Sequence, residues 1–135
     1  MSGSHHIEKV RAILKPDMLI SLKDVSDNFY MELDEDFPDF ESHVLIQKSS
    51  FDEAWPTWEF HPKGDELVYL LSGDTDIVLS LDGGEEVIRV STPGEYVIVP
   101  KGTWHTARPH APTSMLFFTP GKGTLNAYEP GGEPV

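Results

Sequence analysis

Short runs of strand-forming residues follow one another through the middle of this chain, from residue 43 to residue 120. They are rich in Val, Ile, Leu, Phe and Tyr, and their starts recur at roughly 8 to 12 residues, a spacing typical of an antiparallel sandwich or barrel. The runs are HVLIQKSS, WPTWEF, ELVYLL, DIVLSLD, EEVIRV, EYVIVP and SMLFFTP. The turns between them include Ser72-Gly73-Asp74, Asp82-Gly83-Gly84 and Thr92-Pro93-Gly94-Glu95. No convincing helix interrupts the series, so we predict an all-β fold, and a jelly roll protects its strand edges best.

Composition and charge narrow the classes of function. The chain has 135 residues, enough for one domain with a core and too few for two of ordinary size. A net charge of -13 argues against a nucleic-acid partner, because a phosphate backbone requires clustered Lys and Arg. The chain contains no Cys, which excludes disulfides, thiolate metal sites and a cysteine nucleophile. It also lacks an apolar run of about 18 residues and a signal-like start, so we expect a cytoplasmic protein without a membrane partner.

The N-terminal segment is harder to assign. We interpret Met1 to His6 as an expression remnant and therefore leave His5 and His6 out of any site. Ile7 to Leu14 suits either a short helix or an edge strand. Six of the ten residues from 32 to 41 are acidic, which favours a solvated surface loop anchored by its aromatic residues. A dimer contact and a lid over the site are the alternatives.

These patterns divide the chain into three parts. Residues 1-42 are an N-terminal arm, predicted to be irregular and to pack on the barrel. Residues 43-120 are the barrel. Residues 121-135, GKGTLNAYEPGGEPV, are rich in Gly and Pro, and we expect them to lie loosely on the surface as a C-terminal tail.

The stretch Trp58 to Gly73, WEFHPKGDELVYLLSG, carries three candidate metal ligands. Glu59 and His61 are two residues apart on a predicted strand and therefore share one face. A proline and a glycine then break the run before Glu66 begins the next strand. If this bend closes on itself, the three side chains converge, and His105, far downstream, is a candidate fourth member.

Two segments of the chain resemble the paired motifs of the cupin superfamily, which are small double-stranded β-helix barrels. The first motif of that family has the form G-x5-H-x-H-x3,4-E-x6-G, and its second half is matched by His61, Glu66 and Gly73. The second motif, G-x5-P-x-G-x2-H-x3-N, is matched by Gly94, Pro100, Gly102 and His105. The resemblance covers roughly residues 44 to 119, and two such motifs in order are more specific than either alone. Similar HPxGDE and PxGTWH runs occur in small single-domain bacterial cupins of unassigned activity.

The chain departs from these motifs at three positions. Glu59 stands where the first motif has its first histidine, Glu53 where it has its leading glycine, and Pro109 where the second motif ends in asparagine. The departure at Glu59 bears on the metal, because the family set of three imidazoles and one carboxylate becomes two of each.

The resemblance implies a jelly-roll barrel whose mouth holds a divalent metal through Glu59, His61, Glu66 and His105. Imidazole and carboxylate ligands suit Mn, Fe, Ni, Co or Zn, and two carboxylates favour the harder Mn or Fe(II). Alternatively, Glu59 points away or pairs with a base such as Lys63 or Arg108, which leaves three groups.

Two classes of function stay open. The first is a metal-dependent oxygenase, isomerase or decarboxylase acting on a small polar molecule, with His105, Glu66 and His61 as catalytic residues. The second needs no metal: the same residues act as acid and base of an isomerase, or the barrel is a binding module for a small ligand such as a sugar or keto acid. A degenerate barrel kept only for assembly is a third interpretation. We expect a homodimer, formed by strand exchange or sheet packing.

Other conspicuous side chains near the motifs favour simpler roles. His43 and His110 gain nothing from motif context, and His110 is predicted to be a surface residue or a group supporting the site from outside. The three Trp residues are predicted to pack in the core or at an interface. Arg108 is a candidate anchor for an anionic substrate if it faces the barrel mouth.

Overall fold

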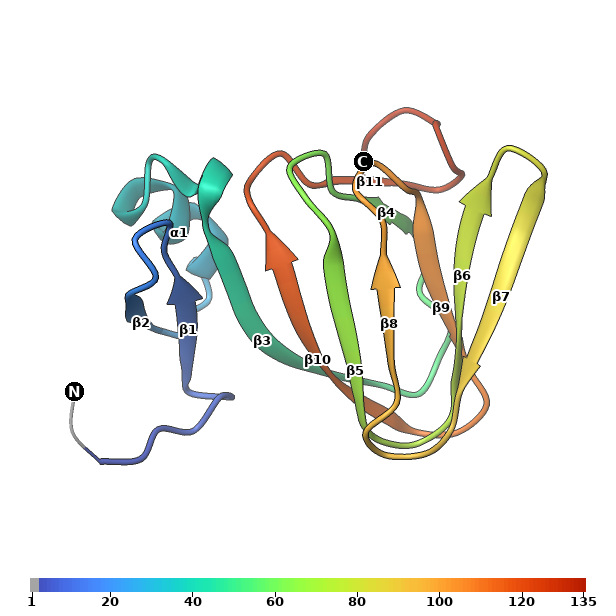
Figure 1. Ribbon diagram of the computed structural model, residues 1–135, viewed down its shortest axis with the longest axis horizontal. Helices are drawn as coiled ribbons and strands as arrows, with labels where there is room; N and C mark the ends of the chain where they lie inside the picture. Colours follow the sequence, from blue (N-terminus) through green and yellow to red (C-terminus); the bar gives the residue numbers. More distant parts are fainter. Residues whose placement is uncertain (1–2) are drawn as a thin grey trace.

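The chain folds into two antiparallel β-sheets packed face to face (Figure 1). The computed structural model describes residues 3–135, apart from the side chain of Glu41. Met1 and Ser2, part of the segment interpreted as an expression remnant, lie outside the described residues. In the described part, the six-stranded sheet has the order β2 (Ile20–Asp24), β1 (Val10–Leu14), β3 (Val44–Phe51), β10 (Thr113–Pro120), β5 (Glu66–Ser72) and β8 (Tyr96–Val99). The five-stranded sheet has the order β11 (Leu125–Ala127), β4 (Trp58–Phe60), β9 (His105–Pro109), β6 (Thr75–Leu81) and β7 (Gly84–Val90).

Most neighbouring strands of the barrel are distant in sequence, as a jelly roll requires. In one sheet β10 lies between β3 and β5, and in the other β9 lies between β4 and β6. The predicted all-β jelly roll is therefore confirmed. The tight turn predicted at Asp82-Gly83 is also present, because Leu81 pairs with Gly84 in the β6–β7 hairpin and leaves those two residues at its tip.

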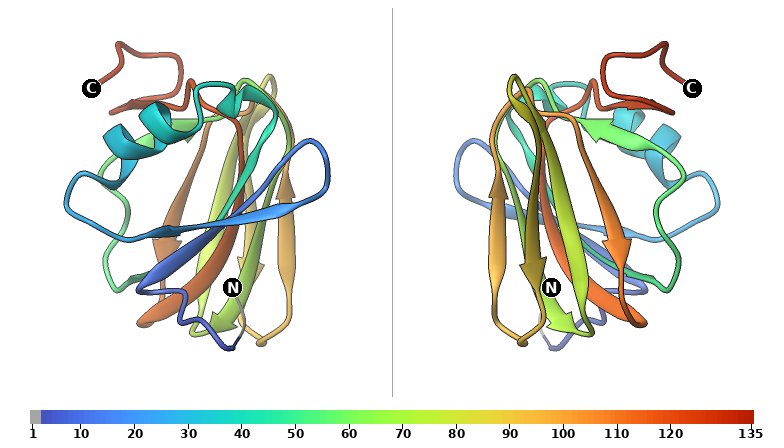
Figure 2. Two further views of the ribbon diagram at one scale, coloured as in Figure 1. Left: turned by 90° about the vertical axis from the view of Figure 1, so that its left-hand side faces the viewer. Right: turned by 90° about the vertical axis from the view of Figure 1, so that its right-hand side faces the viewer.

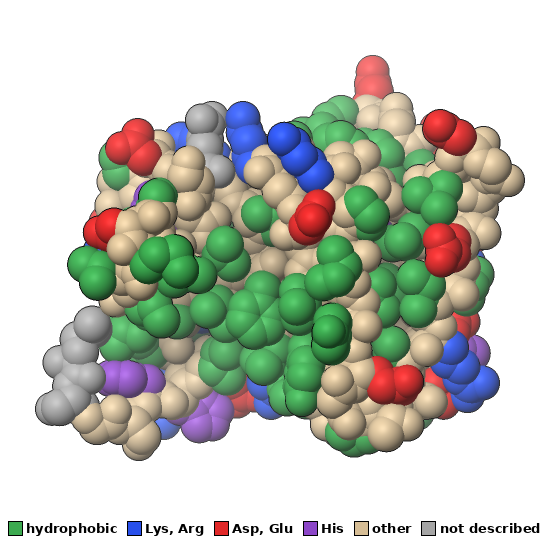
Figure 3. All heavy atoms as spheres, in the orientation of Figure 1, with side chains coloured by type: hydrophobic (Ala, Val, Ile, Leu, Met, Phe, Trp, Pro, Cys, Tyr) green, Lys and Arg blue, Asp and Glu red, His purple; other side chains and the backbone are tan. Residues whose placement is uncertain are grey.

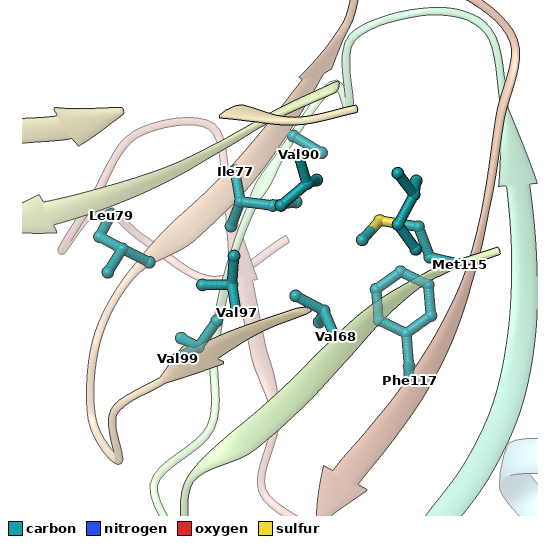
Figure 4. Close-up of a cluster of buried hydrophobic side chains, with 10 residues drawn as sticks. Val68, Ile77, Leu79, Val90, Val97, Val99, Met115 and Phe117 are labelled. Carbon is teal, nitrogen blue, oxygen red and sulfur yellow. The ribbon is translucent and has the colours of Figure 1, made fainter. Parts of the chain in front are cut away.

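The hydrophobic core lies between the two sheets (Figure 4). Alternate residues of each strand point inward, as the period of two predicts, and they meet side chains from the opposite sheet. The cluster consists of Val68, Leu70, Ile77, Leu79, Val90, Val97, Val99, Ala107, Met115 and Phe117. Burying each of the larger side chains contributes about 1.5–3 kcal/mol. This packing makes the barrel a rigid support for groups placed at its open end.

The N-terminal arm is more regular than predicted. Val10–Leu14 forms a strand, β1, which lies between β3 and β2 and pairs with both. The strand interpretation of this segment is therefore correct. Figure 2, left, looks at this end of the molecule, where β1 and β2 run obliquely with the helix α1 (Phe29–Asp36) beside them. A second core, of Ile13, Phe29, Leu33, Phe40 and Leu45, joins the arm to β3.

The acidic segment was predicted to be a solvated loop, and it is instead largely helical, with α1 followed by the short 3-10 turn η1 (Phe40–Ser42). Phe29 and Leu33 are four residues apart and therefore share one helix face, which the second core buries. The acids lie on the other faces, and two of them reach Lys23, with Nζ 2.7 Å from Asp36 Oδ2 and 3.5 Å from Glu32 Oε2. Among residues 3–135, no helix is long and apolar enough to cross a membrane.

The C-terminal tail does not lie loosely on the surface. Its strand β11 pairs with β4, with Asn126 opposite Glu59, and Ala127 is fully buried. The amide of Gly121 also donates to the carbonyl of His43 at 2.8 Å. The physical reason is that β4 would otherwise expose an unpaired edge beside the barrel mouth, and β11 covers it.

Gly73 is the glycine of the barrel that tolerates substitution least. It has φ +106°, and a Cβ there would collide with the carbonyl oxygen of Pro112 and the backbone of Thr113. We predict that Gly73→Ala lowers the free energy of unfolding by about 1–3 kcal/mol, measured by denaturant titration. Gly83→Ala is the matched control, because a Cβ at Gly83 meets nothing within 4 Å, and its change should stay within about 0.5 kcal/mol. Equal effects of the two substitutions would contradict this account of the turn.

Candidate functional site

Four polar side chains converge between the sheets at one end of the barrel. Glu59 lies in the middle of β4, His61 follows the end of β4, Glu66 is the first residue of β5, and His105 is the first residue of β9. Glu59 and His105 are register partners across β4 and β9, and the period of two places His61 on the same face as Glu59. One ligand atom from each of the four lies within 4.8 Å of the others. The structure thus brings together all four residues that the sequence singled out.

The closest approaches in this cluster join the two imidazoles to the carboxylates. Glu66 lies between the rings, with Oε2 3.2 Å from His61 Nε2 and Oε1 3.1 Å from His105 Nε2. Glu59 Oε2 is 3.6 Å from His61 Nε2 and 3.8 Å from His105 Nε2. Glu59 therefore faces the cluster and does not point away from it. The exposed fractions of His61, Glu66 and His105 are 4%, 2% and 1%. Bulk water therefore supplies few of the hydrogen bonds that these side chains lack within the protein.

The two turns that carry the motifs hold each other in place. The amide of Gly102 donates to the carbonyl of His61 at 3.0 Å, and the amide of Lys101 donates to Asp65 Oδ1 at 2.7 Å. The rings of Phe60 and Trp104 pack with their centroids 5.0 Å apart. These contacts fix the positions of the residues beside His61 and His105 relative to one another, which the motif spacing alone does not explain.

Each buried ligand candidate is oriented by a threonine. The hydroxyl of Thr119 donates to Glu66 Oε2 at 2.6 Å, and the hydroxyl of Thr124 lies 2.8 Å from His61 Nδ1. His105 Nδ1 lies 3.1 Å from the carbonyl oxygen of Thr103. Because a carbonyl only accepts, His105 Nδ1 carries a hydrogen, and its Nε2 is left to face the cluster. Sequence reasoning missed all three threonines, since Thr residues in a β protein are common and these follow no motif.

Three atoms of the cluster are buried without a hydrogen-bond partner within the described residues: His61 Nε2, Glu66 Oε1 and His105 Nε2. Leaving buried polar atoms unpaired costs about 1–3 kcal/mol each. Lone pairs facing each other at 3.1–3.2 Å also repel, unless a proton or a cation lies between them. The cluster is thus built to receive positive charge.

The spacing of these atoms fits a single metal ion. With metal–ligand bonds of about 2.1 Å, two ligand atoms around one ion are ~3.0 Å apart at right angles and ~4.2 Å apart when opposite. The four nitrogen–oxygen separations, 3.1, 3.2, 3.6 and 3.8 Å, fall inside this range. The donor set of two imidazoles and two carboxylates is one that divalent first-row metals accept.

The pKa values of the cluster reflect its burial and the closeness of its ionisable groups. Burial raises the pKa of Glu66, but the imidazoles of His105 and His61 outweigh it and lower the pKa to about 2. Burial lowers the pKa of His105, but the adjacent Glu66 and Glu59 carboxylates bring it above its ordinary value. Burial, and then repulsion by Glu66, raise the pKa of Glu59. Glu59 is thus the carboxylate that holds a proton most readily.

A cavity of about 660 Å³ adjoins the cluster, and Glu59, His61 and Glu66 form part of its wall. It extends between the barrel and the N-terminal arm, so that α1 and β1 contribute to its lining as well as the barrel strands. Trp55, which packs on Phe117, and Asn126 of β11 also line it. A lid over the site was one alternative for the acidic segment, but no pattern in the sequence indicated that β1 or the C-terminal tail would reach this space.

Other residues considered from the sequence lie away from the cavity. The guanidinium of Arg108 pairs with Glu85 at 3.3 Å and lies over the ring of Trp58, so it is not an anion anchor in the mouth and does not neutralise Glu59. His110 is a surface residue 3.0 Å from Asp76 Oδ2. His43 is buried and stacks on Phe40, which is the structural role expected of it.

No protein-family model matches the sequence, and no curated protein matches it either. Solved structures do share the fold. A cupin superfamily protein from Desulfitobacterium hafniense DCB-2 is 24% identical, with a TM-score of 0.49 over 58% of this chain and 68% of that chain. Hydroquinone 1,2-dioxygenase from Sphingomonas sp. TTNP3, solved with 4-hydroxybenzoate bound, is 17% identical, with a TM-score of 0.50 over 59% of this chain and 60% of that chain. Oxalate decarboxylase from Bacillus subtilis is 17% identical, with a TM-score of 0.52 over 61% of this chain and 23% of that chain.

At these identities the likenesses concern the fold alone. They agree with the two antiparallel sheets of the structure. The chain has the cupin fold.

Proposed function

We propose that the protein binds one divalent metal ion through Glu59, His61, Glu66 and His105, and acts on a small polar molecule in the adjoining cavity. The observation that carries the proposal is that His61 Nε2, Glu66 Oε1 and His105 Nε2 are buried without a hydrogen-bond partner within the described residues, while each imidazole Nε2 lies 3.1–3.2 Å from an oxygen of Glu66. A cation placed among them removes both the repulsion and the missing interactions. The threonines behind the ligands supply the outer hydrogen bonds that metal sites use to orient their first ligands.

Among Mn, Fe, Ni, Co and Zn, the donor set favours Mn(II) or Fe(II). Carboxylate oxygens are hard ligands, and Glu59 adds a second one where the family motif has an imidazole. The Bacillus subtilis oxalate decarboxylase, which shares the fold, has Mn(II) centres, and this supports the choice. Two carboxylates also neutralise the charge of a divalent ion, so this site is a weaker Lewis acid than one with three imidazoles.

The reaction class is that of a metal-dependent oxygenase, isomerase or decarboxylase. The bound ion would polarise a substrate oxygen at a coordination position left open toward the cavity. His61, Glu66 and His105 act in this proposal by holding the ion, because burial removes them from direct contact with bulk solvent. Glu59 is about one-third exposed and lines the cavity, so it is the one of the four ligands most open to solvent, and its raised pKa belongs to the metal-free protein.

Metal content tests the proposal directly. Protein purified without an affinity tag, after growth with added manganese and iron, should contain about one metal ion per chain by elemental analysis. Glu66→Gln keeps the side-chain shape but removes the charge, and it should weaken binding by more than the roughly 10- to 100-fold that loss of an outer-shell partner costs. His105→Ala should do the same. His110→Ala is the matched control, because His110 lies on the surface.

Two outcomes would change the proposed metal site. Wild-type protein without stoichiometric metal contradicts the proposal and leaves the acid–base isomerase or the small-ligand binding module. Full metal content in Glu59→Gln shows that three residues hold the ion and that Glu59 is free for proton transfer.

Metal affinity should rise with pH. The raised pKa of His105 keeps a proton on the metal-free cluster above the usual value of 6.5, and metal binding must expel it. The apparent affinity therefore falls as the pH drops through that raised pKa, by up to about tenfold per pH unit for one displaced proton, and levels off above it. The same proton stabilises the metal-free fold below pH 6.5, and this contribution is lost as the pH rises through the raised pKa. Calorimetric titration in buffers of different ionisation enthalpy measures the released protons, and an affinity independent of pH would contradict the assignment.

We also propose that the protein is a homodimer, formed through the outer face of the six-stranded sheet. Hydrophobic side chains gather across the middle of this face (Figure 3), and Tyr96 and Ile98 on it are 59% and 46% exposed. By strand alternation the face also carries Ile46, Leu67, Tyr69, Leu71, Leu116 and Phe118. The four strands that carry these side chains, at about 4.8 Å spacing and about 17–20 Å length, give roughly 350 Å² of flat surface, about half of the ~800 Å² per partner of a standard interface. A second copy suits it because an apolar face is its own complement, whereas the net charge of -13 opposes contacts elsewhere.

Light scattering coupled to size-exclusion chromatography tests the dimer. Wild-type protein should elute at about twice the chain mass of 15.1 kDa, and Ile98→Lys should shift the mass to that of one chain. Val87→Lys is the matched control, because Val87 is 55% exposed on β7 of the other sheet, and it should stay dimeric. A monomeric wild type, or a dimer unaffected by Ile98→Lys, would rule out this interface.

A further inference from the structure

The N-terminal arm places an arginine in the wall of the cavity. Arg11, on β1, lines the cavity together with Glu59 and His61, although it comes from outside the barrel motifs. Its guanidinium lies 4.4 Å from the ring centroid of Phe29 and 5.9 Å from that of Tyr30. These two rings hold the guanidinium in one place through cation–π contacts. Among the described side chains, which leave out that of Glu41, no carboxylate lies within ion-pair distance of it, so its N–H donors are open to a ligand.

The register of the six-stranded sheet sets the distance between Arg11 and the candidate metal centre. Ala12, next to Arg11, pairs with Ile46 of β3, and β3 pairs with β10, which in turn pairs with β5 where Glu66 lies. Through this register Arg11 lies in line with Val68, two residues along β5 from Glu66. Three strand spacings of about 4.8 Å and two residues of about 3.3 Å along the strand put the backbone of Arg11 roughly 16 Å from that of Glu66. Both side chains reach into the same cavity, so a small molecule lying along it can meet both groups at once.

The cavity wall carries apolar side chains as well as polar ones such as Gln47, Ser49 and Thr57. Leu45, Trp55 and Phe117 lie along it, and they suit the body of a ligand that is not itself charged. The two other cations of the cavity wall are already engaged, Lys48 with Glu8 Oε1 at 2.7 Å and Lys122 with a backbone carbonyl at 2.8 Å. The cavity thus offers an apolar surface for part of a ligand, and one guanidinium that no described carboxylate engages.

The helix α1 adds one carboxylate and one hydroxyl to this end of the cavity. Asp34 lines it but is exposed, so solvent screens its charge. The hydroxyl of Tyr30 donates to Gln47 Oε1 at 3.0 Å, which ties the helix to β3 beside Arg11. Neither group neutralises the guanidinium, whose planar fork suits a bidentate carboxylate.

We propose that Arg11 binds the carboxylate of the substrate, and that the substrate is a small amphipathic carboxylic acid with an oxygen donor at its other end. The carboxylate pairs with Arg11, the apolar body lies against the cavity wall, and the far oxygen reaches the centre of Glu59, His61, Glu66 and His105. The far end of this arrangement rests on the proposed metal site, whereas the Arg11 end stands without it.

The test compares carboxylates with neutral analogues of the same shape. The probes are 4-hydroxybenzoate, 4-hydroxyphenylacetate and 3-(4-hydroxyphenyl)propionate, each with its amide, titrated calorimetrically into metal-loaded and metal-free protein. At least one acid should bind wild type about 10- to 100-fold more tightly than its amide, the usual worth of a charge-assisted pair. Arg11→Met should abolish this preference, and Arg11→Lys, which keeps the charge but not the fork, should restore part of it.

Two controls separate this inference from the metal proposal. Arg108→Met removes an arginine that lies away from the cavity, and it should leave the preference for acids unchanged. Elemental analysis of Arg11→Met should show the wild-type metal content, and its circular dichroism should show a native fold. If no acid binds, or if Arg11→Met binds acids as wild type does, the assignment of Arg11 is overturned. If wild type binds no metal, the metal-free titrations still decide the role of Arg11.

Discussion

The candidate site depends on holding two imidazoles and two carboxylates against one another in a place where water does not separate them. Two imidazole nitrogens lie 3.1 and 3.2 Å from the two oxygens of one buried carboxylate, and such an arrangement does not persist unless its surroundings enforce it. The enforcement comes from the packed sheets beneath, from hydrogen bonds between the two motif turns, and from a threonine behind each of His61, Glu66 and His105. A cation bound in the centre would relieve the repulsion among these groups, and this relief would add to its binding free energy.

The barrel itself completes only part of the site. Thr124 and Asn126 come from the C-terminal segment, which covers the edge of β4, and Arg11 comes from a strand added to the sheet on the opposite side. The helix α1 closes the cavity between them. The arm and the tail therefore supply lining residues that a bare barrel would lack, and under the proposed function they would contribute to substrate preference.

Local patterns in the sequence were enough for the strands and for the four clustered residues. Strand periodicity and turn residues predicted the barrel, and the spacing of His61, Glu66 and His105 matched a family pattern that places them at one end. Whether Glu59 faced the cluster could not be predicted, because the family has another residue there. The helix in the acidic segment was missed because its two buried residues, Phe29 and Leu33, acquire meaning only from a second core formed with distant strands. The same reason hid Arg11 and Thr124, whose partners lie far away along the chain.

The central claim is that one metal ion lies among Glu59, His61, Glu66 and His105. Anomalous diffraction from crystals of manganese-loaded protein, recorded on either side of the manganese absorption edge, tests it most directly. The account predicts a single strong anomalous peak within about 2.3 Å of His61 Nε2, His105 Nε2 and a Glu66 oxygen. Absence of that peak, with His61 and His105 instead donating well-aligned hydrogen bonds to Glu66, would show that protons alone balance the cluster and would contradict the account.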